Sequence, residues 1–80
     1  MVVKKLIPNN ITVTEQIKLR DDIISAICKW SGQRQLEKID LTKLEIESGI
    51  RCWYLVSAKT FVDLECVDEK LYMWFMLKWL

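Results

Sequence analysis

The final stretch of the chain, residues 68–80 (DEKLYMWFMLKWL), decides how the rest must be arranged. Its last ten residues are all apolar except Lys78, and they include Trp74 and Trp79. The stretch contains no Val, Ile or Thr, so its local preference is helical rather than extended. Asp68 is suited to be the N-cap, and Glu69 adds a negative charge to the first turn. We therefore predict a short C-terminal helix.

This helix is apolar around its whole circumference. At about 100° per residue, residues 71–77 cover every direction around the axis. A helix of that kind needs cover on all sides. Either two helices cover both faces of a sheet within the monomer, or the last helix lies half in the core and half in an interface. For the second case, the predicted interface residues are Trp53, Phe61, Tyr72, Trp74, Phe75, Met76 and Trp79.

Length and composition limit the classes of protein to which this chain could belong. Eighty residues form one small domain, residues 1–80, and a chain of this size buries only about 60% of its unfolded surface. A net charge of +1 argues against a polyanionic partner or an anionic membrane surface. Three widely spaced cysteines indicate buried thiols in a reducing compartment rather than a disulfide framework. The N-terminus does not resemble a signal peptide, and the C-terminal apolar run is only half as long as a membrane span. We therefore expect a cytoplasmic protein.

The first half of the chain predicts an edge strand and a long helix. Residues 2–7 have the composition of a strand, and the two lysines suit an edge. An amphipathic helix is predicted from Val13 or Glu15 to Trp30, with a capping box formed by Thr12 and Glu15 and a left-handed Gly32 after its end. Residues 33–40 fit either a further helical turn or the start of a strand, and the sequence leaves this open.

From residue 41 to residue 67 apolar and polar residues alternate, which predicts strands with one buried face. The apolar residues of neighbouring strands fall on the same face only if residues 47–49 form a three-residue loop, with Gly49 left-handed. The same argument places a second loop at residues 58–60. The predicted fold class is therefore α+β in the order β-α-β-β-β-α, with a mainly antiparallel sheet packed by two helices. The buried stripe would contain Leu44, Ile46, Ile50, Cys52, Tyr54, Val56, Val62, Leu64 and Cys66.

Few residues could carry catalysis. The chain has no histidine, the commonest general base, and Asp21 and Asp22 diverge by about 100° on their helix. A carboxylate cluster of Asp63, Glu65 and Glu45 could build a metal-dependent hydrolase, but a solvated sheet face with cross-strand ion pairs is the commoner outcome. We predict no enzyme, no cofactor and no metal.

Two arginines are candidates for binding charge on a partner. Arg20 lies on the same line of its helix as Ile27, and Arg51 lies on the polar face of the predicted sheet. Arg20 could bind a partner's carboxylate, or its stem could pack while the guanidinium reaches solvent or a carboxylate of the same chain.

The order helix, three strands, helix is similar to that of double-stranded-RNA-binding domains. The alternative function is therefore a nucleic-acid-binding module, and the residues that it would use here are Lys18, Arg20, Arg34 and the face of Trp53. Where such domains carry a basic cluster, at the start of the last helix, this chain has Asp68, Glu69 and Lys70, and the sheet face with Trp53 and Phe61 is acidic. These departures argue against nucleic acid, and the resemblance remains one of element order.

Protein binding is the function that the sequence favours. Exposed aromatic and Met-rich surface is typical of interfaces. The hypothesis is a non-catalytic protein–protein interaction module, most simply a homodimer through its last helix, acting as a small regulator or inhibitor of a larger protein complex.

Overall fold

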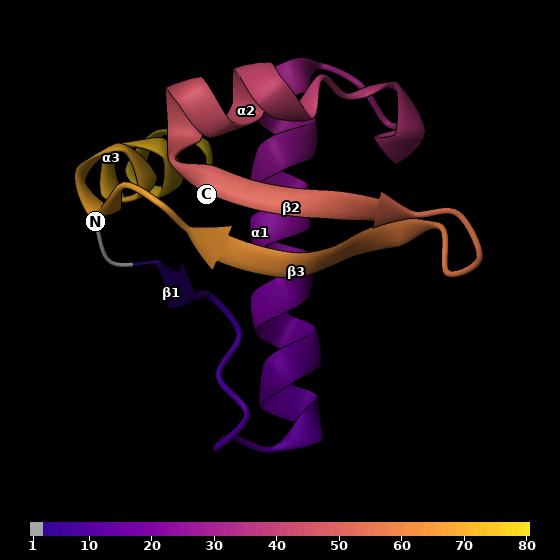
Figure 1. The fold of residues 1–80 in the computed structure, drawn as a ribbon, viewed down its shortest axis with the longest axis vertical. Coiled ribbons are helices and arrows are strands. Elements are labelled where there is room, and N and C mark those ends of the chain that lie inside the picture. Colours follow the sequence, from indigo (N-terminus) through magenta and orange to yellow (C-terminus); the bar gives the residue numbers. More distant parts are fainter. Residues whose placement is uncertain (1–2) are drawn as a thin grey trace.

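The computed structural model describes residues 3–80 (Figure 1). These residues form an α+β fold in which three α-helices accompany a three-stranded antiparallel sheet, in the order β-α-α-β-β-α. The radius of gyration, 11.9 Å, is close to the value of about 11.6 Å that compact domains of this length follow. The elements are β1 (Lys4–Lys5), α1 (Val13–Ser31), the 3₁₀ helix η1 (Leu36–Lys38), α2 (Leu41–Ser48), β2 (Ile50–Leu55), β3 (Thr60–Cys66) and α3 (Glu69–Trp79).

Helix α1 begins and ends at the residues that its capping signals predict. The Thr12 hydroxyl accepts a hydrogen bond from the Glu15 N–H at 3.2 Å. At the other end Gly32 is left-handed (φ 67°) and donates its N–H to the Cys28 carbonyl. Both caps are local, so the sequence was sufficient to predict them.

Residues 41–48 form helix α2, so the prediction of a first strand in this region was wrong. The Asp40 carboxylate accepts hydrogen bonds from the N–H groups of Thr42 and Lys43, both at 3.1 Å, and so caps the helix. Leu44 is fully buried, whereas Ile46, which was expected beside it, is 68% exposed. Over so short a segment, the alternation of apolar and polar residues fits the period of a strand and that of a helix. The caps at the two ends of the segment favour the helix.

Gly49 is left-handed as predicted (φ 70°), but it ends α2 instead of turning a hairpin. The preceding stretch, residues 33–40, contains η1 and places Ile39 in the core. Ser48 is buried, and its hydroxyl donates to the Leu44 carbonyl at 2.6 Å and accepts from the Ile50 N–H. The polar atoms at this junction are thus satisfied inside the protein.

The strands lie in the order β1-β3-β2. The predicted N-terminal edge strand is present but short, with Lys4 opposite Cys66 and Lys5 opposite Glu65; Val2, which the prediction included, lies outside the described residues. In Figure 1, α1 crosses behind β2 and β3, and no helix of residues 3–80 lies in front of them. The possibility of one helix on each face of the sheet is therefore not realised.

A β-bulge in β3 changes which residues face the core. Arg51 pairs with Glu65 but Trp53 pairs with Val62, so β3 has one residue more than β2 between these pairs. Asp63, inside that interval, has a left-handed φ of 54°. The extra residue turns Phe61 into the core, where it is fully buried. Its predicted position on the outward face was wrong, because the parity argument assumed an unbroken strand.

The loop between β2 and β3 also differs from the prediction. It covers residues 56–59 rather than 58–60, and Lys59 is its left-handed residue (φ 53°). Val56, expected in the buried stripe, is 75% exposed in this loop.

The hydrophobic core lies between α1 and one face of the sheet. Ile23, Ala26 and Ile27 of α1 are almost fully buried. They belong to one cluster that also includes Ile39, Leu44, Ile50, Cys52, Phe61, Leu64 and Phe75.

Gly49 lies where two chain reversals meet. Its carbonyl accepts a hydrogen bond from the Val67 N–H at 2.8 Å. A Cβ placed on Gly49 would lie 2.5 Å from the Asp68 carbonyl oxygen, whereas a Cβ on Gly32 would meet nothing within 4 Å. The α2–β2 connection therefore packs directly against the β3–α3 connection.

This difference between the two glycines gives a stability prediction. Both have left-handed backbones, so Gly32→Ala should cost about 1 kcal/mol from backbone strain alone. Gly49→Ala adds a collision with backbone and should lower the free energy of unfolding by about 3 kcal/mol. Urea unfolding of the two variants beside the wild type measures the difference. Equal losses of unfolding free energy would show that the close approach at Gly49 does not contribute to stability.

Candidate functional site

Helix α3 divides its apolar residues between the core and the surface. The Asp68 carboxylate accepts from the Leu71 N–H at 3.1 Å, which confirms Asp68 as the N-cap. Phe75 is buried and meets the ring of Trp30 edge to face, with 6.3 Å between ring centroids. Tyr72, Met76 and Trp79 are half-buried around it. One side of α3 thus closes the core.

The other side of α3 is left open. Three of its large apolar side chains, together with that of the C-cap residue Leu80, are 61 to 83% exposed. We call this surface the α3 ridge, and it consists of Met73, Trp74, Leu77 and Leu80.

Beside the α3 ridge a groove of about 410 Å³ runs between α1 and α3. From α1 it is lined by Leu19, Asp22 and Ile23, and Leu19 is 37% exposed. From α3 it is lined by Tyr72, Met73, Met76, Leu77 and Leu80. The α3 ridge and this groove form one apolar surface across two helices.

The structure separates the seven residues predicted as an interface. Phe61 and Phe75 are enclosed by the chain, and Tyr72, Met76 and Trp79 are half-buried. Trp53 and Trp74 are exposed, but Trp53 belongs to β2 and Trp74 to α3.

Sequence reasoning missed four residues of the surface, namely Leu19, Met73, Leu77 and Leu80. Because α3 is apolar on all sides, no pattern within it indicates which half faces outward.

A second cavity brings together three of the four tryptophans. It has a volume of about 610 Å³ and lies where the end of α1 meets α2 and α3. We call it the tryptophan pocket. Its walls include Trp30, Trp74, Phe75 and Trp79, and its polar lining includes Lys38, Asp40, Lys43, Glu47 and Lys78.

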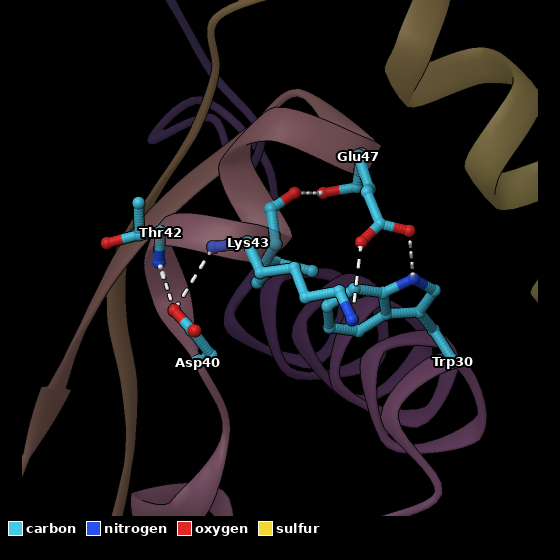
Figure 2. Close-up of polar contacts among 7 residues, drawn as sticks. Trp30, Asp40, Thr42, Lys43 and Glu47 are labelled. Atoms are coloured by element: carbon cyan, nitrogen blue, oxygen red, sulfur yellow. Dashed lines mark hydrogen bonds and ion pairs between the residues drawn. The ribbon is translucent and has the colours of Figure 1, made fainter.

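Figure 2 shows the polar contacts on one side of the tryptophan pocket. The Trp30 indole donates to one carboxylate oxygen of Glu47 at 3.4 Å, and the Lys43 ammonium lies 3.9 Å from the other. Glu47 therefore connects α1 to α2. Asp40 points to the N-terminus of α2, where it accepts the two backbone hydrogen bonds that cap the helix.

The two predicted binding arginines lie in different settings. Arg51 forms a half-buried ion pair with Glu65 at 3.8 Å. Arg20 is half-buried and lines a groove of about 400 Å³ together with Lys5, Asp63 and Glu65. Among residues 3–80 no ion pair involves Arg20.

The structure separates the groups that the alternative functions need. Arg34 lines a different groove from Arg20, beside Tyr54 and Lys59. Glu45 lies on α2 rather than on a strand beside Asp63 and Glu65. Within the described part of the chain, no three His, Cys, Asp or Glu side chains are close enough together to hold a metal ion.

The three cysteines are free thiols. Burial raises the pKa of Cys52 to about 12 and also raises the pKa values of Cys28 and Cys66. A nucleophilic cysteine needs the opposite shift, because the thiolate is the reactive form.

Comparison with protein-family models, with curated proteins and with solved structures found no significant match to this chain. Among residues 3–80, no helix combines the length and the apolar character needed to cross a membrane.

The raised pKa of Cys52 predicts a pH dependence of stability. Below about pH 8.5, the pKa of an unfolded thiol, Cys52 is protonated in both states. Between that pH and about 12 the unfolded chain loses the proton while the folded chain keeps it, so stability falls by up to about 1.4 kcal/mol per pH unit.

Cys52→Ala should remove this part of the slope. Urea unfolding under reducing conditions at several values between pH 8 and pH 11 measures it. The remaining slope comes from Cys28, Cys66, Tyr54, Tyr72 and Lys4, whose pKa values are raised too. Parallel stability curves for Cys52→Ala and wild type would contradict the assignment.

Proposed function

We propose that this chain is a non-catalytic protein–protein interaction module that pairs with a second copy of itself through the α3 ridge. The supporting observation is the exposure of Met73, Trp74, Leu77 and Leu80 on one side of one helix. Large apolar side chains grouped in this way are typical of interfaces, whereas single exposed ones are ordinary.

The surface area supports a paired state. A folded monomer of 9.5 kDa is expected to expose about 5,050 Å², and this chain exposes 5806 Å². The excess of roughly 750 Å² is close to the 800 Å² or so that each partner buries in a standard interface. One partner of equal size would bring the exposed surface back to the usual value.

The geometry of the ridge suits self-association. Met73 and Leu77 are four residues apart, and Leu77 and Leu80 three apart, so these side chains are neighbours along the helix. In a two-fold pair the same ridge contacts itself, so one row of side chains supplies both halves of the interface. A net charge of +1 per chain creates little repulsion between two copies.

A role as a small regulator or inhibitor follows from the same surface. A larger protein that presents a matching apolar helix would compete with the second copy for the α3 ridge. Binding to this chain would block the larger protein's helix, and pairing of two copies of this chain would release it. Three free thiols suit a reducing, cytoplasmic setting for this exchange.

Sedimentation equilibrium at micromolar to millimolar concentration tests the pairing. The wild type should approach twice the mass of the 9.5 kDa chain. Leu77→Lys should remain monomeric, because it places a charge in the middle of the ridge. It should keep its circular dichroism spectrum, because Leu77 is 83% exposed.

Val56→Lys is the matched control, since Val56 is 75% exposed in the β2–β3 loop and outside the ridge. It should associate as the wild type does. A wild-type mass of one chain over the whole concentration range, or equal weakening by both substitutions, would refute the proposal.

A further inference from the structure

The tryptophan pocket shares Trp74 with the α3 ridge, but its other lining residues lie outside the surface proposed for pairing. Its volume of about 610 Å³ lies within the range of about 300 to 1,000 Å³ that small-molecule sites occupy. Three tryptophans and Phe75 come together there from α1 and α3, although Trp30 and Trp74 are far apart in the sequence. Such walls offer flat apolar faces on which a planar ring can stack.

Both carboxylates of the pocket are already engaged. Glu47 accepts a hydrogen bond from the Trp30 indole and lies beside the Lys43 ammonium. Asp40 accepts the N–H groups of Thr42 and Lys43 at the start of α2. Neither carboxylate is free to balance a cationic ligand, although aromatic walls alone would suit one.

Two lysines of the pocket have no acidic partner within the described residues. Lys38 and Lys78 both line it, and neither forms an ion pair with residues 3–80. The Lys78 ammonium lies 5.2 Å from the centre of the Trp79 ring, so a positive charge sits directly beside an aromatic wall. The unbalanced charge of the pocket is therefore positive.

We infer that the tryptophan pocket binds a small aromatic carboxylate, with the ring against Trp30, Trp74 and Trp79 and the carboxylate at Lys38 and Lys78. The aromatic walls supply apolar burial and stacking, and the two ammonium groups supply charge-assisted hydrogen bonds to the anion.

Isothermal titration calorimetry with three probes of one shape tests the charge preference. The probes are 1-naphthoate, the neutral 1-naphthamide and the cationic 1-naphthylmethylammonium. The carboxylate should bind most tightly and the cation least. Equal affinity for the anion and the amide, tighter binding of the cation, or no heat with any probe at millimolar concentration would overturn the inference.

Variants locate the site. Lys78→Gln should weaken 1-naphthoate binding about tenfold, as the loss of a charged hydrogen-bond donor does, whereas Lys70→Gln, on the same helix but outside the pocket, should not. Trp74→Ala should weaken binding, and Trp53→Ala, at another exposed tryptophan, in β2 and outside the pocket, should leave it unchanged. Equal losses in the two members of either pair would place the ligand elsewhere.

The Leu77→Lys variant separates this inference from the proposed pairing. Leu77 belongs to the α3 ridge and does not line the tryptophan pocket. Naphthoate binding should therefore persist in Leu77→Lys even where association is lost. Loss of naphthoate binding in this folded variant would show that the pocket is not an independent site.

Discussion

The contact between Gly49 and the β3–α3 connection fixes where two of the three helices join the sheet. The Gly49 carbonyl accepts the Val67 N–H, and the missing side chain of Gly49 lets the Asp68 backbone approach closely. Ile50 and Cys66 pair beside this contact, so β2 begins where β3 ends. Helix α2 therefore ends, and helix α3 begins, at the same end of the sheet (Figure 1). The tryptophan pocket is lined by residues from these two helices and from the end of α1. A single close backbone approach thus sets the positions from which α2 and α3 pack against the core.

Features controlled by neighbouring residues could be predicted from the sequence. The caps of α1 at Thr12 and Gly32 and the cap of α3 at Asp68 are hydrogen bonds within one turn, and their signals are local. Helix α2 carried equally local signals at Asp40 and Gly49. They were outweighed by an alternating pattern that eight residues are too few to make decisive.

Features that depend on distant contacts could not be predicted. The β-bulge requires Asp63 to adopt a left-handed backbone. Because Asp63 is not a glycine, the sequence gives no signal for this conformation. The bulge moves Phe61 into the core. The orientation of α3 also depends on contacts with residues that are distant in the sequence. Its outward half is set by where Phe75 meets Trp30 across the fold, so the exposed residues Met73 and Leu77 could not be told from buried ones.

The shortness of β1 has a consequence for how the protein can misassemble. Among residues 3–80, Lys4 and Lys5 pair with β3, and the Leu6 N–H donates to the Leu64 carbonyl at 3.0 Å. The ion pair of Lys4 with Glu69, at 2.6 Å, is exposed to solvent and to screening by salt. If β1 detaches, the end of β3 around Glu65 and Cys66 becomes an unprotected sheet edge that can pair with a strand of another molecule. The N-terminal strand thus covers one end of the β3 edge, and the ion pair that helps to hold it there weakens as ionic strength rises.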